Sequence, residues 1–172
     1  MSPRSLHLLR IRNAFVAVVA AGGLCIAAAQ TAAKPPPRPN HPAAKGHKLD
    51  HSGRKQVGKA SFYARQFNGR KMADGTPMNP RDDNAASKTL PLGTKALVTN
   101  LETGQSAVVT IQDRGPYVDG RIVDLSPSTA EKIGLSREQG LAAVEVAPIA
   151  VPQPDGSMKP GDAASSMAAN AY

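Results

Sequence analysis

Apolar and polar side chains alternate along several short stretches of the chain, and a period of two is typical of β-strands. Residues 58–64 alternate small and aromatic side chains, and residues 142–149 contain two valines on either side of a glutamate. The clearest signal lies in residues 95–113, where two runs rich in Val and Thr flank LETGQ, a turn that contains Gly104. Residues 120–126 form one further short strand. The pattern therefore predicts a mostly β domain.

One helix is predicted directly after the strand at residues 120–126. Ser126 is a suitable N-cap, Pro127 suits the first turn, and Gly134 stands where a C-terminal cap belongs. Residues 136–140 (SREQG) are predicted to add one more helical turn. So short a set of strands is most simply closed as an antiparallel barrel, accompanied by one or two short helices.

The first 29 residues have the composition of an export signal. Three arginines precede an apolar, uncharged run that ends in AAA, a small-residue cleavage site. The sequence therefore predicts a signal peptide in residues 1–29, cleaved before Gln30, with an uncleaved membrane anchor as the alternative. Cys25 would carry the lipid in a lipoprotein, but Leu24 stands where a lipobox has a small residue, so lipid anchoring at Cys25 is the lesser alternative.

Composition changes on both sides of the predicted strands. Residues 30–56 contain six Lys/Arg, one Asp and several prolines but few large apolar side chains, which predicts a disordered, basic linker. Residues 57–149, the predicted barrel, contain eleven Lys/Arg and ten Asp/Glu. Residues 150–172 show no periodicity and are predicted to form a flexible C-terminal tail. The net charge of +8 therefore belongs mainly to the segments before the barrel.

This charge distribution limits the partners. A basic linker in an exported protein favours an anionic membrane or wall surface, and a solvated spacer is the simpler alternative. No aromatic residues are interleaved with the basic ones, so nucleic acid is excluded as a partner. All four histidines and the single cysteine lie outside residues 57–149, so we predict neither a metal site nor a cofactor in the barrel. The oligomeric state is left open.

A series of motifs inside the predicted barrel resembles one known family. They are GKASFYA, TLPLGT, VTN, TG, DRGPYV, GRIVDLS and VEV, and together they span almost all of residues 57–149. In this order and spacing they resemble the rare lipoprotein A (RlpA) family. The resemblance implies a six-stranded double-psi β-barrel, a fold shared with plant expansins. It also implies a protein of the cell envelope that acts on peptidoglycan glycan strands.

The resemblance implies a reaction as well. Active members of this family are endolytic lytic transglycosylases, lyases that cleave the glycan strand without water and leave a 1,6-anhydro-muramyl end. They prefer strands stripped of stem peptides. They carry a Glu where this chain has Thr76 and a His where this chain has Ser87. Of the three catalytic residues expected from the family, only the Asp of the DRGP motif remains, as Asp113.

A single carboxyl group is the chemical minimum for this reaction. The 6-hydroxyl of the sugar is itself the nucleophile, so one carboxyl group can protonate the leaving oxygen and then accept the hydroxyl proton. This makes Asp113 the predicted acid and base. The alternative is a structural role, in which Asp113 is buried as an ion-pair brace against Arg114 or Arg121.

Further side chains are candidates for substrate contact. They are Tyr63, Thr76, Ser87, Arg114 and Tyr117. The two tyrosines would stack on sugar rings, unless they belong to the core. Among the other carboxylates, Asp74 and Asp119 each precede a glycine, which is typical of turns, and Asp124 suits an ion pair with Arg114 or Arg121.

Two functions follow from these residues. The first is an RlpA-type lytic transglycosylase with Asp113 as its acid and base. The second is a non-catalytic, expansin-like barrel that binds peptidoglycan without cutting it. The retained Asp113 and the barrel motifs favour the enzyme, whereas Thr76 and Ser87 in place of Glu and His favour the binding module.

Overall fold

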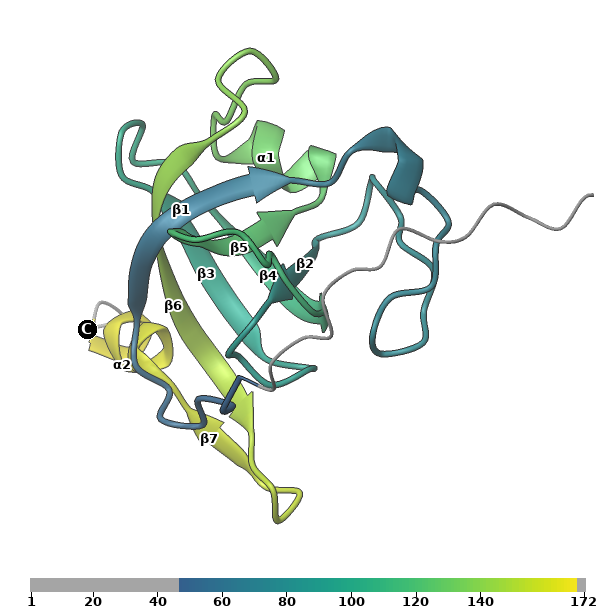
Figure 1. The fold of residues 1–172 in the computed structure, drawn as a ribbon. Coiled ribbons are helices and arrows are strands. Elements are labelled where there is room, and N and C mark those ends of the chain that lie inside the picture. The colour runs from purple at the N-terminus through teal and green to yellow at the C-terminus, as the bar shows by residue number, and fades with distance from the viewer. Residues whose placement is uncertain (1–46, 170–172) are drawn as a thin grey trace, which may run out of the picture. The chain divides into compact units, whose positions relative to one another are not determined.

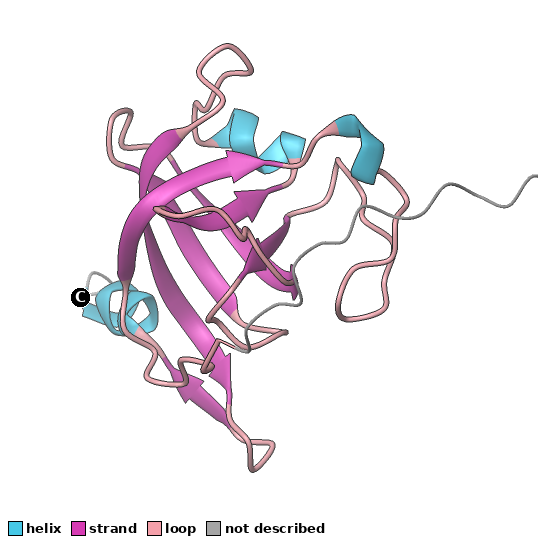
Figure 2. Cartoon of the chain, viewed as in Figure 1, coloured by secondary structure: helices cyan, strands magenta, loops and turns pink. Residues whose placement is uncertain are grey.

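The computed structural model describes residues 47–169, and their strands form one barrel (Figure 1). The sheet order is β1-β5-β2-β4-β3-β6-β7, and β1 also pairs with β6, so the first six strands close on themselves. The strands are β1 (Gln56–Phe62), β2 (Asn84–Ser87), β3 (Lys95–Asn100), β4 (Ser106–Asp113), β5 (Arg121–Leu125), β6 (Ala142–Pro152) and β7 (Met158–Pro160). The helices are the 3-10 helix η1 (Arg65–Phe67), α1 (Pro127–Lys132) and α2 (Asp162–Ala169) (Figure 2).

The directions of the strand pairs identify the type of barrel. β1 runs parallel to β5 and β2 runs parallel to β4, whereas the remaining pairs are antiparallel. This mixed, closed barrel of six strands confirms the double-psi fold that the resemblance implies. The purely antiparallel barrel favoured by the strand pattern is wrong, because alternation reveals the two faces of a strand but not the direction of its partner.

The sequence pattern missed β2, the strand between β4 and β5. Its four residues read NAAS, and all four are buried. A strand covered on both faces has no alternation to detect, and its two alanines offer little β propensity. β2 nevertheless helps to position Asp113, because its Ala86 is the β-sheet partner of Asp113 at the end of β4.

The core follows from the alternation on the other strands. On β4, Val109 and Ile111 are almost completely buried. Val108, which points to the opposite face of the strand, is 44 % exposed. Val144 and Val146 of β6 are buried in the same cluster, as the alternation around Glu145 predicts. One face of each of these strands therefore fills the barrel.

Local sequence determines both ends of α1. The Ser126 side chain accepts a hydrogen bond from the Thr129 N–H and Pro127 occupies the first turn, so the predicted N-cap is confirmed. Gly134 follows the helix with a φ of +73°, and the Leu135 N–H reaches back to the Ala130 carbonyl as in a Schellman motif. The extra turn predicted at residues 136–140 is present as a single turn, in which the Gly140 N–H donates to the Ser136 carbonyl four residues earlier, and it does not continue into a helix.

The C-terminal segment folds onto the barrel, whereas the sequence predicted a flexible tail for residues 150–172. β6 extends to Pro152, β7 pairs with it, and α2 contacts β6. A Cβ on Gly161 would lie 2.3 Å from the Pro148 carbonyl oxygen, so only glycine permits this close approach. The single buried side chain of α2, Ala163, anchors the helix without producing the periodicity that a sequence search detects.

The last residues of the predicted linker also pack against the barrel. The His51 ring lies 2.9 Å from the Pro152 carbonyl oxygen, and the Asp50 N–H donates to the Thr89 carbonyl. The Asp162 N–H donates to the Gly53 carbonyl, so the segment before β1 also contacts the start of α2. The predicted signal peptide, Cys25 and most of the predicted linker lie outside the described residues. Within residues 47–169, no helix has the length and apolar character needed to cross a membrane.

Two neighbouring valines on β4 provide a test of this core. We expect Val109→Ala to lower the free energy of unfolding by about 2 kcal/mol, because a fully buried side chain loses its apolar contacts and leaves a cavity. Val108→Ala, the same change on the exposed face, should cost less than about 0.5 kcal/mol. Urea denaturation of the two variants measures the difference, and equal costs would contradict the assignment of faces.

Candidate active site

Asp113 is the last residue of β4, and its carboxylate accepts three hydrogen bonds. The Ala73 N–H and the Arg114 N–H donate to Oδ1 at 2.9 and 2.8 Å, and the Tyr63 hydroxyl donates to Oδ2 at 3.1 Å. The residue is half-buried. No ion pair holds Asp113 within the described part of the chain. The carboxylate is thus oriented by hydrogen bonds while part of it faces a pocket.

Tyr63 follows directly after β1 and orients Asp113. Its side chain is only 8 % exposed, and its ring meets the Phe67 ring edge-on, with 5.9 Å between centroids. Burial, followed by the nearby Asp113 carboxylate, raises the pKa of the Tyr63 phenol above its ordinary value. The phenol therefore stays protonated and donates a hydrogen bond to Asp113. Its hydroxyl bonds to Asp113, which differs from the simple sugar-stacking role predicted from sequence.

A hairpin-like loop, residues 69–78, supplies the Ala73 N–H. Lys71 and Pro77 form an isolated bridge at its base, and the Asp74 carboxylate accepts the Thr76 N–H in the turn at its tip. Asp74 is therefore the turn residue that its place before Gly75 predicts. The same carboxylate accepts the Gln112 side-chain amide, and the Asp74 N–H donates to the Gln112 carbonyl. These two bonds fasten the loop to the end of β4.

A pocket of about 220 Å³ opens beside Asp113. Two aromatic rings, Tyr63 and Phe67, and two buried methionines, Met72 and Met78, supply its apolar lining. Two basic side chains, those of Arg70 and Lys71, complete the lining together with Asp113. Apolar walls with a few polar groups are typical of ligand sites, and rings with a nearby carboxylate suit a sugar.

The two residues that replace the family's Glu and His do not enter this pocket. The Thr76 hydroxyl donates to the Asp74 carboxylate at 2.7 Å, on the side of the loop that faces Gln112. Ser87 is 1 % exposed, and its hydroxyl oxygen accepts the backbone N–H groups of Thr89 and Leu90. The structure thus places the Ser87 hydroxyl in the interior, where it shapes a turn rather than contacting a ligand.

Arg114 and Tyr117 lie on the segment that leaves β4. The Arg114 guanidinium donates to the carbonyls of Ser87 and Leu90, at 3.3 and 2.7 Å, and so fixes the turn after β2. It forms no ion pair with Asp113, and the predicted alternative of an Asp–Arg brace is therefore wrong for this residue. Tyr117 is 53 % exposed and does not line the pocket beside Asp113.

The brace belongs instead to Asp124. Its carboxylate forms an ion pair with Arg121 and accepts the Ser61 hydroxyl, which links β1 and β5. Asp119 lies in the turn that precedes β5. The predicted structural roles of Asp119 and Asp124 are both confirmed, and Asp113 is left as the carboxylate that lines the pocket.

Comparison with known proteins identifies the family. Residues 55–146, just over half of the chain, match the sequence model of the family described as lytic transglycolase. The chain belongs to the lytic transglycolase family. Three similar relatives are each named endolytic peptidoglycan transglycosylase RlpA. They come from Pasteurella multocida strain Pm70 (52 % identical over 84 residues), Haemophilus influenzae strain Rd (46 % over 94) and Vibrio cholerae strain N16961 (42 % over 99).

These matches cover about half of the chain but a smaller share of the relatives. They span 49, 54 and 58 % of this chain, and 29, 33 and 37 % of the three relatives in the same order. Among solved structures, a Streptomyces papain inhibitor has a TM-score of 0.45 at 24 % identity, covering 55 % of this chain and 94 % of the other. A Clavibacter michiganensis expansin has a TM-score of 0.43 at 19 % identity, covering 55 % of this chain and 50 % of the other.

Several parts of the candidate site were not predicted from the sequence. The Ala73 N–H belongs to a backbone group, and the lining by Met72, Met78 and Arg70 depends on how the 69–78 loop folds back over Asp113. The signal that could have identified the loop is the D-G turn at its tip, because such a turn brings the flanking residues together as a hairpin.

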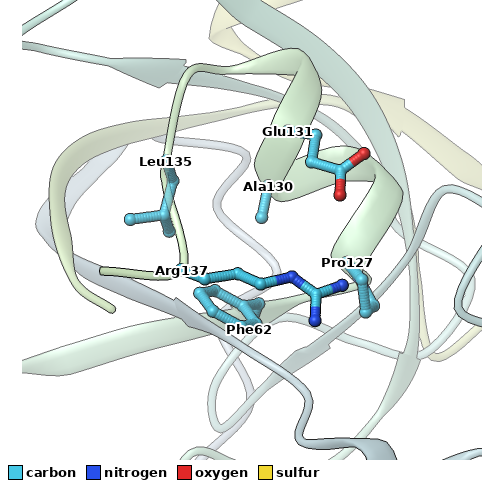
Figure 3. A pocket seen from close by; sticks show the side chains of 6 residues that line it. All are labelled: Phe62, Pro127, Ala130, Glu131, Leu135 and Arg137. Carbon is cyan, nitrogen blue, oxygen red and sulfur yellow. The ribbon is translucent and has the colours of Figure 1, made fainter. Parts of the chain in front are cut away.

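A second hollow lies between α1 and β1, where Phe62, Ala130 and Leu135 meet Glu131 and Arg137 (Figure 3). Its volume is about 10 Å³, room for no more than one water molecule. It is a packing gap and not a ligand site.

The raised pKa of Tyr63 predicts a pH dependence of stability. In the unfolded chain the phenol ionises near pH 10.0, and in the folded chain it stays protonated to higher pH. The stabilisation is therefore fully present below pH 10 and is lost as the pH rises above it. We expect the difference in unfolding free energy between the wild type and Tyr63→Phe to be constant near neutral pH and to shrink above about pH 10. Denaturant titrations at several pH values measure it, and a difference that stays unchanged into the alkaline range would contradict the raised pKa of the buried Tyr63 phenol.

Proposed function

We propose that this protein is an endolytic lytic transglycosylase that cleaves peptidoglycan glycan strands, with Asp113 as the acid and base. One observation carries the proposal: the Asp113 carboxylate lines a pocket of about 220 Å³, oriented by three hydrogen bonds and free of any ion pair within the described residues. The names of the similar relatives support the same substrate and reaction.

The reaction needs one proton to move twice. The protonated Asp113 carboxyl group donates to the glycosidic oxygen as the bond from that oxygen to the sugar C1 breaks, which leaves positive charge on C1 and the ring oxygen. The 6-hydroxyl of the same sugar then attacks C1 and gives its proton to the Asp113 carboxylate. The product is a 1,6-anhydro ring, no water is consumed, and the carboxyl group returns to its starting state.

The protein contributes orientation to both steps. The Tyr63 hydroxyl and the Ala73 N–H hold the carboxylate in one position when the proton has left, and they do so without neutralising it as an arginine would. Phe67 and the two methionines give the sugar an apolar surface and reduce the access of water, which would compete with the 6-hydroxyl.

The proposal extends to the rest of the chain. Residues 1–29 would serve as a signal peptide and residues 30–56 as a basic tether, placing the barrel in the cell envelope, where peptidoglycan lies. The six Lys/Arg of the tether would favour an anionic membrane or wall surface.

A binding module is the second candidate, and one observation favours it. The Thr76 hydroxyl donates to Asp74 and Ser87 is buried, so the described pocket lining offers neither a second carboxylate nor a histidine beside Asp113. A barrel of this kind would hold the glycan strand in the same pocket without cleaving it.

Product analysis separates the two functions. The purified chain is incubated with peptidoglycan freed of stem peptides, and the soluble products are examined by mass spectrometry. We expect 1,6-anhydro-muramyl ends, and we expect Asp113→Asn to lower their rate of formation at least about a hundredfold, because an amide cannot donate or accept the proton.

Asp119→Asn is the matched control, since it makes the same change in a turn outside the pocket. It should leave the rate unchanged. Glycan that is bound but yields no anhydro product would refute the enzyme and support the binding module. Equal rates for the wild type and Asp113→Asn would refute Asp113 as the acid and base.

A further inference from the structure

Two consecutive basic residues, Arg70 and Lys71, line the pocket beside Asp113. The backbone of the 69–78 loop fixes their position: the Met78 N–H donates to the Arg70 carbonyl, and Lys71 is bridged to Pro77. Because the tip of this loop is fastened to Gln112 and Asp113, the two cations and the carboxylate belong to one connected unit.

Neither basic side chain has an acidic partner. Within residues 47–169, the ion pairs join Lys55 to Glu145, Arg121 to Asp124 and Lys132 to Asp83. Arg70 and Lys71 take part in none of them and donate no side-chain hydrogen bond to the described protein. Both residues are exposed, so their charges are hydrated and their donors remain available to a ligand in the pocket.

The Arg70 guanidinium is oriented without using up its donors. Its central carbon lies 5.8 Å from the centre of the Phe67 ring, a cation–π contact. Phe67 in turn packs edge-on against Tyr63, whose hydroxyl bonds to Asp113. The planar group is thus held on an aromatic surface while its N–H groups remain available.

Asp113 offsets one of these two positive charges at most, and within residues 47–169 it forms no ion pair with either cation. Its Oδ1 accepts two backbone N–H groups and its Oδ2 accepts the Tyr63 hydroxyl. The pocket therefore carries two cations against one carboxylate that is already hydrogen-bonded, an excess of positive charge that selects an anionic ligand.

The chemistry of the donors indicates which anion. An arginine presents parallel N–H groups that match the two oxygens of a carboxylate, and a lysine adds a point charge. In peptidoglycan, muramic acid carries a lactyl group whose carboxylate is free when no stem peptide is attached and becomes a neutral amide when one is.

We propose that Arg70 and Lys71 form a carboxylate subsite that recognises a free sugar-acid group on the glycan strand bound beside Asp113. This inference rests on the proposed function for the identity of the glycan. The two residues determine specificity and take no part in proton transfer.

The test compares one glycan in two charge states. Stem-peptide-free glycan strands are used as prepared, or after carbodiimide coupling to methylamine, which turns their carboxylates into neutral amides. Binding of the full chain is measured at low temperature, with Asp113→Asn alongside as a variant that leaves the glycan uncut. We expect the amidated glycan to bind about tenfold more weakly to both proteins, the loss typical of one charge-assisted hydrogen bond.

The variants assign this preference to the two side chains. Arg70→Gln and Lys71→Gln should each bind the untreated glycan about tenfold more weakly and distinguish less between the two glycans. Arg70→Lys should keep part of the preference, because it retains the charge and loses the paired N–H groups. Arg81→Gln removes the same charge from an exposed loop position outside the pocket and should bind like the wild type. Circular dichroism confirms that each variant is folded.

The outcomes separate this inference from the proposed function. Equal binding of the two glycans by the wild type, or an unchanged preference in Arg70→Gln and Lys71→Gln, would overturn the subsite even if anhydro products form. A preference that depends on Arg70 and Lys71 would support the subsite even if no product forms and the protein proves to be a binding module.

Discussion

The hydrogen bonds to the Asp113 carboxylate hold together three segments that are far apart in the sequence. Tyr63 comes from the end of β1, Ala73 from the 69–78 loop, and Arg114 from the residue after β4. Each donor has its position because of the barrel: β2 is paired with β4 at Asp113, and β1 closes the barrel by pairing with β5 and β6. Together with the two Asp74–Gln112 bonds and the burial of Met72 and Met78, this acceptor holds the 69–78 loop against the end of β4 and so shapes the pocket.

Two kinds of structure could be predicted from the sequence. Strands with one exposed face, such as β4, and the capped helix α1 were predicted because their signals are local. β2 was not predicted, since both of its faces are buried and it has no alternation. The parallel directions of two strand pairs came only from the family resemblance, because side-chain patterns do not encode the partner of a strand.

The residues of the candidate site also fall into those that local motifs predict and those that they do not. The turn at Asp74 and the ion pair of Asp124 were predicted from local motifs. Among the residues predicted to contact substrate, Tyr63 lines the pocket, whereas Thr76, Ser87, Arg114 and Tyr117 do not. Ser87 illustrates the cause: a small polar residue at the end of a buried strand is as suitable for capping a turn as for binding a sugar. Only the positions of the Thr89 and Leu90 N–H groups decide between these roles.

Thr76 and Ser87, which stand where the resemblance implies Glu and His, change what the remaining residues would have to do. In this chain Thr76 stabilises the turn at Asp74, and Arg114 and Ser87 stabilise the turn after β2, so these positions contribute to rigidity. The proposed reaction then depends on one carboxylate, oriented by a phenol that burial keeps protonated. A single proton carrier cannot compensate for a loosely bound substrate, because the 6-hydroxyl must reach C1 before water does. Binding groups beside Asp113 therefore matter more here than in a site with three catalytic residues, and Arg70 and Lys71 are the charged groups that the fold places there.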